Sequence, residues 1–242
     1  MNQELYKEDR KIIGILACSA EGAALAYRTI CLEGQNYLGE HMHPEVILHG
    51  HALGLYMIPI REGGEEGWRE VGALMQDSYE RLVSAGAEVI ICPDNTIHQA
   101  YDHVQQKASV QWLHIARVVA AEASRQGYKR LAVLGTRYLM EGPVYAEALK
   151  AASIDRHIPN ETERGEINRI IFEELVNGIF SSEARTYFVA VINRLKELGC
   201  DAVVLGCTEI PLLIGEADSP LPVLDSTRLL ARAALLNSCS CS

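Results

Sequence analysis

The strongest constraint on the fold of this chain is a sequence pattern that occurs twice. Residues 86–96 (GAEVIICPDNT) align without gaps with residues 199–209 (GCDAVVLGCTE). Both copies have a glycine, an acidic residue two positions later, an apolar run and a polar turn, and a weaker match relates residues 11–19 to residues 129–137. A repeat of this kind predicts two halves of about 110 residues, each near the size of a small domain.

Short apolar runs alternate with longer helical patterns along both halves. Strands buried on both faces read as continuous apolar runs, and parallel strands need crossover helices, so the pattern predicts an α/β protein. We expect two pseudo-symmetric lobes, each a mostly parallel sheet flanked by helices, with the active site between them. The expected lobes are residues 11–112 plus 214–238 and residues 113–213, with tails at 1–10 and 239–242, and the expected strands are 12–16, 46–49, 89–92, 131–134, 202–205 and 222–224. Gly86, Gly127 and Gly199 follow three expected helices, as C-terminal caps do.

Composition limits what such a chain binds. A net charge of −10, without a dense run of Lys or Arg, argues against nucleic-acid binding. No apolar run approaches the length of a membrane span, and the charged N-terminus lacks the apolar core of a secretory signal, so we expect a cytoplasmic protein with no membrane partner. The cysteines, odd in number, are expected to be free thiols, with Cys239 and Cys241 in a frayed tail beyond the last helix.

The repeat places Asp94 and Cys207 at equivalent strand ends. Ligands of open α/β sheets bind outside the carboxyl ends of the strands. If the lobes face each other about a pseudo-twofold axis, the two side chains point at one substrate from opposite sides. This geometry suits inversion at a carbon centre, because a planar carbanion formed by loss of a proton from one face is reprotonated by an acid on the other.

Cys207 is the strongest candidate for a catalytic residue. Backbone N–H groups at its strand end are expected to favour the thiolate, although a buried packing cysteine fits the same pattern. A thiolate there helps to keep Asp94 protonated, which gives one base and one acid. The alternative for Asp94 is the N-cap of the helix that begins at Asn95 and Thr96. His98, which follows on the same helical face, either orients Asp94 or caps a turn.

Short polar residues follow several of the expected strands. Such side chains bind carboxylates together with N–H groups at helix starts, although each one alone is an ordinary cap. We expect a carboxylate-binding set formed by Ser19, Asn95, Thr96, Thr136 and Thr208.

Four histidines lie near one another in the sequence, namely His41, His43, His49 and His51. Pro44 and an expected strand separate them, and no neighbouring carboxylate or cysteine pattern completes a set of metal ligands. No nucleotide-binding fingerprint is present in the sequence. We therefore expect no metal and no cofactor.

Six motifs occur in order along almost the whole chain. They are Ser19-Ala20-Glu21; Asp94-Asn95-Thr96 with His98; Leu134 to Tyr138; Ile167 to Leu175; Gly206 to Ile210; and Pro222 to Asp225. The sequence thereby resembles the cofactor-independent aspartate/glutamate racemase superfamily, and most of all its bacterial members of broader specificity. It departs from their pattern at Asp94, where these racemases have Cys or Thr, and at Glu166, where aspartate-preferring members have Lys.

The resemblance implies a homodimeric amino-acid racemase or epimerase that works without pyridoxal phosphate. Cys207 and Asp94 then exchange the α-proton, with His98 and Glu209 beside them. Glu166 either faces the substrate side chain and favours a cationic or neutral amino acid, or points to solvent at a helix start. Two other classes fit the sequence: a lyase or cis-trans isomerase of a small dicarboxylate that uses a single cysteine, and a non-catalytic carboxylate-binding relative.

Overall fold

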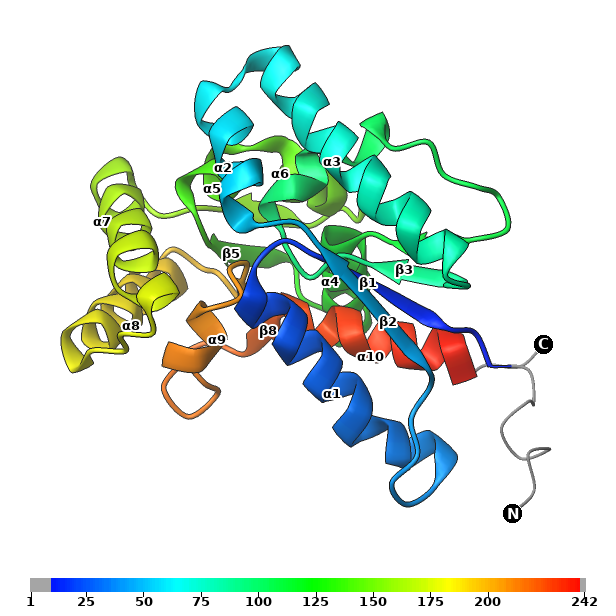
Figure 1. Cartoon of the computed structure of the whole chain (residues 1–242). Coiled ribbons are helices and arrows are strands. Elements are labelled where there is room, and N and C mark those ends of the chain that lie inside the picture. The colour runs from blue at the N-terminus through cyan, green and yellow to red at the C-terminus, as the bar shows by residue number, and fades with distance from the viewer. Residues whose placement is uncertain (1–9, 240–242) are drawn as a thin grey trace. The chain divides into compact units, whose positions relative to one another are not determined.

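The protein is described by a computed structural model of residues 10–239, which divides into two compact units (Figure 1). Within that range, the first unit comprises residues 10–93, 100–114 and 230–239, and the second comprises residues 94–99 and 115–229. The segment 94–99, which follows the apolar run of the first repeat copy, therefore groups with the second unit.

The first unit contains a parallel four-stranded sheet in the order β2-β1-β3-β4. Its strands are β1 (Ile13–Ala17), β2 (Val46–Gly50), β3 (Val89–Ile91) and β4 (Gln111–Leu113). Its helices are α1 (Ala20–Leu38), α2 (Leu53–Glu62) and α3 (Gly64–Ser84), followed by the 3₁₀ helix η2 (Thr96–His103), whose first residues belong to the second unit. Helices α2 and α3 pack side by side (Figure 1).

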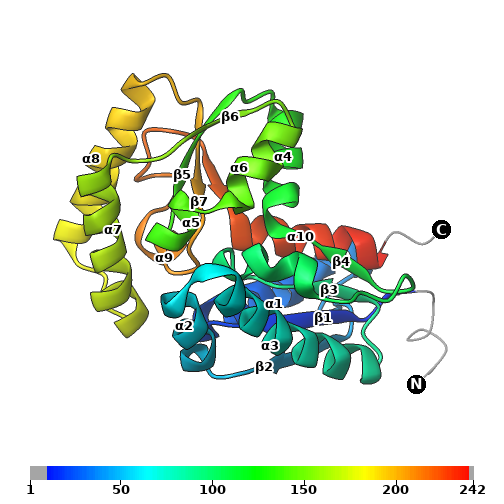
Figure 2. The same cartoon turned by 90° about the horizontal axis from the view of Figure 1, so that it is seen from above.

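The second unit contains a parallel sheet in the order β6-β5-β7-β8. Its strands are β5 (Arg130–Leu134), β6 (Asp155–His157), β7 (Ala202–Leu205) and β8 (Val223–Asp225). Its helices are α4 (Ile115–Gln126), α5 (Arg137–Glu141), α6 (Pro143–Ala151), α7 (Glu161–Glu173), η3 (Leu175–Asn177), α8 (Ser182–Glu197), α9 (Ile210–Leu213) and the start of α10 (Ser226–Cys239). Figure 2 shows α7 and α8 side by side.

The two sheets have the same strand order, so the predicted α/β class with two similar lobes is confirmed. β1 and β5 take the same position in their sheets, as do β3 and β7, in agreement with the two sequence matches. The predicted glycine caps are also present, since Gly86, Gly127 and Gly199 have φ angles of 106°, 81° and 89° that favour glycine.

The second sheet is buried on both faces. Leu134 and Leu205 point into one apolar cluster, whereas Val133 and Val204 point into another. This alternation follows from the strand repeat of two residues, and it explains why β5 and β7 read as continuous apolar runs. It also gives the loops that follow these strands a rigid base.

Several boundaries differ from those expected. The edge strands β4 and β6 were not predicted, because each is short and carries polar residues. β8 pairs with β7 in the second sheet, whereas residues 214–238 were expected in the first lobe. Helix α10 extends to Cys239, which was expected in a tail. Cys241 lies outside the described residues.

Along residues 10–239, every helix is too short or too polar to cross a membrane.

Candidate active site

Gly206 follows β7 at a position where close packing leaves no room for a side chain. The Gly206 N–H donates to the Leu134 carbonyl over 2.7 Å, which holds the ends of β7 and β5 together. A Cβ atom at Gly206 would lie 2.5 Å from Leu139 Cδ2 and 2.9 Å from the Leu134 carbonyl oxygen, closer than packed atoms allow. Cys207 is therefore fixed at the carboxyl end of β7, where ligands of α/β sheets bind.

A buried carboxylate is bonded to the Cys207 thiol. The Cys207 Sγ donates to Glu209 Oε2 over 2.9 Å, and the Thr208 hydroxyl donates to the same oxygen over 2.7 Å. Thr208 and Glu209 are each only 4% exposed. Two donors on one buried oxygen compensate the loss of water around the Glu209 charge.

This environment keeps Cys207 protonated. Burial raises the pKa of the Cys207 thiol well above its usual value, and the nearby negative charges of Glu209 and Asp94 raise it further. A backbone hydrogen bond from Glu209 acts in the opposite direction and does not outweigh them. The expected thiolate is therefore corrected: burial and the adjacent carboxylate outweigh the backbone N–H groups at the strand end.

Asp94 lies two residues before η2, in the segment that groups with the second unit. Its Oδ1 accepts from the Ile97 N–H over 3.1 Å, which is the N-cap interaction that the sequence left open. His98 binds the backbone of Asp94, with Nδ1 donating to the carbonyl over 2.7 Å, while Nε2 accepts from the Ile115 N–H over 3.3 Å. These two bonds define the tautomer and show that His98 positions the main chain at Asp94.

Asn95 belongs to a buried chain of hydrogen bonds. The Tyr145 hydroxyl donates to Asn95 Oδ1 over 2.8 Å, and Asn95 Nδ2 donates to Ser226 Oγ over 3.0 Å. Ser226 in turn donates to the carbonyl of Leu205, the last residue of β7, over 2.8 Å. The chain ties the Asp94 segment to the strand that precedes Cys207. The oxygen and the nitrogen of the Asn95 side-chain amide each have a hydrogen-bond partner in this chain of bonds.

Two threonine hydroxyls meet nearby. The Oγ1 atoms of Thr96 and Thr136 lie 3.1 Å apart, and Thr136 Oγ1 also accepts from the Leu139 N–H as the N-cap of α5. Thr96 follows Asp94 and Asn95, whereas Thr136 follows β5. The second unit thus joins residues from the turns after β5, β7 and β8 to the 94–99 segment at one end of its sheet.

Ser19 and Glu166 have other partners in the structure. Ser19 lies in the first unit, where its Oγ caps α1 by accepting from the Gly22 N–H. Glu166 lies on α7, where its Oε1 accepts from Arg169 Nη2 over 2.7 Å, and this bond lowers the pKa of the Glu166 carboxyl. Arg169 also binds Glu173 and Glu174.

Sequence reasoning missed two members of the site and one feature outside it. Tyr145 and Ser226 carry no local motif, since a tyrosine in an apolar helix and a serine at a helix start are common. Two of the four histidines, His49 and His51, come together with Asp77 of α3. No local pattern pointed to that carboxylate, because helix α2 separates Asp77 from the two histidines along the chain.

Comparisons with known proteins identify the family of the chain. A model of the family described as Asp/Glu/hydantoin racemase matches residues 35–234. A solved structure from Yersinia pestis, described as a candidate Asp/Glu racemase, is 32% identical, covers 94% of this chain and 99% of its own, and superposes with a TM-score of 0.85. An aspartate racemase homologue from Pyrococcus horikoshii is 28% identical with the same coverage and a TM-score of 0.80.

Among proteins of assigned activity, the chain is similar to the broad-specificity amino-acid racemase RacX of Bacillus subtilis. The two are 23% identical over 159 residues, which is 66% of this chain and 68% of RacX. The family model covers most of the sequence, including both turns that follow β5 and β7. The chain is thus an isomerase of the racemase type, and it belongs to the Asp/Glu/hydantoin racemase family.

Proposed function

We propose that this protein is an amino-acid racemase or epimerase that acts without pyridoxal phosphate, with Cys207 and Asp94 as the groups that exchange the α-proton. The observation that carries the proposal is the hydrogen bond from Cys207 to the buried Glu209, next to the charge of Asp94. A thiol that can pass its proton to an adjacent carboxylate has two usable states, one acidic and one basic.

The proton balance follows from the resting state. In one direction, the Asp94 carboxylate removes the α-proton and the Cys207 thiol gives its proton to the other face of the carbanion, so the enzyme ends with protonated Asp94 and a Cys207 thiolate. In the other direction, the thiolate removes the α-proton and Asp94 returns one. The two forms of the free enzyme interconvert as Cys207 exchanges a proton with water through Glu209, and Asp94 exchanges its own proton with water in the opposite direction.

The substrate carboxylate is proposed to bind among the hydroxyl groups beside the reacting pair. Thr96 and Thr136 face each other there, and Thr208 stands next to Cys207. A hydroxyl donates as readily as it accepts, so the Thr96–Thr136 contact can open to give both donors to an anion. Ser19 remains a proposed member of this set.

The side chain of the substrate is proposed to be cationic or neutral, through Glu166. That carboxylate is 37% exposed and paired with Arg169, so its charge is partly neutralised in the free protein. Arg169 has two further acidic partners, Glu173 and Glu174, and can retain them while it releases Glu166 to a substrate ammonium group.

The deciding experiment is α-proton exchange in deuterium oxide, followed by NMR and by chiral chromatography, with single enantiomers of acidic, neutral and cationic amino acids. We expect deuterium at the α-carbon and formation of the other enantiomer. Maleic and arylmalonic acids are run in parallel. Their conversion without any amino-acid exchange would replace the proposal with a lyase or cis-trans isomerase, and no conversion of either class would leave a binding protein.

A further inference from the structure

The first unit holds a cluster of potential metal ligands that the racemase mechanism does not use. His49 lies in β2, His51 follows the strand, and Asp77 lies on α3. One ligand atom from each lies within 4.8 Å of the other two. We propose that these three residues form a binding site for a divalent transition metal ion of the Zn²⁺ class.

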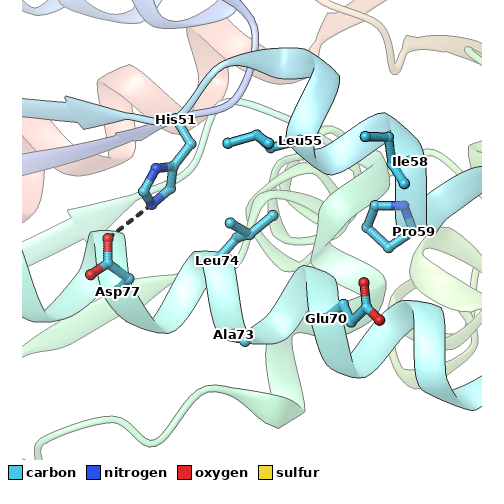
Figure 3. A pocket seen from close by; sticks show the side chains of 8 residues that line it. All are labelled: His51, Leu55, Ile58, Pro59, Glu70, Ala73, Leu74 and Asp77. Atoms are coloured by element: carbon cyan, nitrogen blue, oxygen red, sulfur yellow. Dashed lines mark ion pairs between the residues drawn. The ribbon is translucent and has the colours of Figure 1, made fainter.

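The contact between His51 and Asp77 is unlike an ordinary ion pair. His51 Nε2 lies 2.9 Å from Asp77 Oδ2, as the dashed line in Figure 3 shows. The nitrogen is buried, yet the two atoms are not aligned for a hydrogen bond. A buried imidazole nitrogen this close to a carboxylate oxygen, without a well-aligned hydrogen bond, is available to a metal ion.

His49 is already oriented by a neighbouring residue. Its Nδ1 lies 2.9 Å from the hydroxyl oxygen of Ser78, a side chain with no exposed surface. Metal-binding histidines characteristically use one ring nitrogen for such an outer hydrogen bond, which fixes the ring and leaves the second nitrogen for the metal. With Nδ1 held by Ser78, Nε2 is the atom that His49 offers.

Arg81 competes with a metal ion for the Asp77 carboxylate. Its Nε donates to Asp77 Oδ2 over 2.8 Å. This bond occupies a carboxylate oxygen that a metal ion would use, and the guanidinium charge opposes a second cation, so Arg81 is expected to limit the affinity of the site.

The donor set selects the metal. Two imidazoles and one carboxylate suit Zn²⁺, Co²⁺ and Ni²⁺ better than Mg²⁺ or Ca²⁺, which prefer oxygen ligands alone. Zinc bonds to such ligands measure about 2.0–2.1 Å, which puts tetrahedral ligand atoms roughly 3.4 Å apart, so the cluster closes by small side-chain rotations. Three protein ligands leave one coordination position open.

That open position lies beside a pocket of about 460 Å³. His51 and Asp77 line one end of it, Leu55, Ile58 and Leu74 line its wall, and Glu70 stands at the other end (Figure 3). A water molecule or a small anionic ligand can therefore reach the metal. This site and the one around Cys207 belong to different units of the chain.

The test uses the untagged full-length protein and Zn²⁺ in calorimetric titration, with Co²⁺ as a spectroscopic probe. We expect one equivalent of Zn²⁺ bound per chain, and Co²⁺ absorption typical of nitrogen and oxygen ligands without a thiolate charge-transfer band. His49→Ala, His51→Ala and Asp77→Ala should each abolish that equivalent. His41→Ala is the matched control, because this histidine also has an acidic neighbour, Glu40, but is 88% exposed.

Two further variants protect the test against misfolding of the ligand variants. Ser78→Ala should weaken Zn²⁺ binding by about tenfold or more, the usual effect of an outer-shell partner. Arg81→Gln should strengthen binding, because it removes the competing cation while the fold is unaffected by a surface change. The proposal is overturned if Zn²⁺ does not bind, if binding persists in all three ligand variants, or if Arg81→Gln weakens it.

Discussion

The turns that follow β3 and β7 begin from the same sequence pattern and end with different chemistry. Cys92 follows β3 directly and has no exposed surface, whereas Cys207 follows β7 after a glycine and bonds to a carboxylate. Residues 94–99, which follow Cys92 after one proline, group with the second unit. The two copies of the repeat therefore share the backbone arrangement of a parallel sheet. The one or two residues that follow each strand determine which chemistry takes place at its end.

The largest expected effect separates the two cysteines. Cys207→Ser should lower racemisation by about a thousandfold or more, because a serine hydroxyl is far less acidic than a thiol and removal of an acid-base group costs up to that range. Circular dichroism should report an unchanged fold. Cys92→Ser should instead lower stability by roughly 1–3 kcal/mol, since it buries a hydroxyl in an apolar core, and should leave the rate per folded molecule unchanged. Equal racemisation rates in Cys207→Ser and Cys92→Ser would contradict the proposed difference between the two cysteines.

Asp94→Asn tests whether Asp94, in the turn after β3, transfers a proton in addition to capping the helix start. Asparagine retains the oxygen that accepts from Ile97, so the helix start should persist. We expect racemisation to fall by about a hundredfold, with deuterium exchange surviving for one enantiomer only. Normal racemisation would leave Asp94 with its capping role alone.

Glu209→Gln tests the origin of the raised Cys207 pKa. The Glu209 charge disfavours the thiolate, so its removal should lower the thiol pKa and shift the onset of alkylation by iodoacetamide to lower pH. Turnover should nevertheless fall by about tenfold or more, because the group that receives the Cys207 proton is lost. An alkylation profile that stays in place, or moves to higher pH, would contradict this electrostatic account.

Tyr145→Phe measures the buried link between Asn95 and β7. The variant leaves Asn95 Oδ1 without its donor and should lower the free energy of unfolding by about 1–2 kcal/mol in urea titrations. In the first unit, the Tyr79 hydroxyl accepts from the N–H of the exposed Lys107, in the loop before β4. Tyr79→Phe should cost less, since water can replace that partner at a partly exposed site. A larger loss of unfolding free energy in Tyr79→Phe than in Tyr145→Phe would show that the buried hydrogen bond to Asn95 stabilises the protein no more than the partly exposed one.

The smallest effect is expected at Glu166. Because its ion pair with Arg169 is partly exposed and therefore weak, Glu166→Gln should change the ratio of lysine to aspartate turnover by less than about fivefold. Glu166→Lys should move the ratio toward aspartate. A wild-type preference for aspartate, or an unchanged ratio in the lysine variant, would remove Glu166 from the substrate site.

The sequence was sufficient to predict the central strands of both sheets but not the edge strands β4 and β6. β5 and β7 are buried on both faces and therefore read as apolar runs, whereas β6, with Asp155 and His157, has the composition of a loop. The repeat also located the two turns that contain Asp94 and Cys207.

Contacts between distant parts of the chain could not be read in the same way. The bond from Tyr145 to Asn95 and the approach of Asp77 to His51 depend on how helices pack, which no local pattern records. The charge state of Cys207 was misjudged for a related reason: burial and the Glu209 carboxylate outweigh the strand-end N–H groups, and their relative strength depends on three-dimensional geometry.

A cysteine that is a thiol in the free enzyme is also oxidised more slowly than one that is a thiolate. Peroxide attacks the thiolate, and the sulfenic acid that forms is the first step toward irreversible damage. In the form of the enzyme that keeps its proton against Glu209, with only 9% of its surface exposed, Cys207 is a poor target for peroxide. The carboxylate that raises the pKa of the Cys207 thiol is therefore expected to slow the oxidation of this residue.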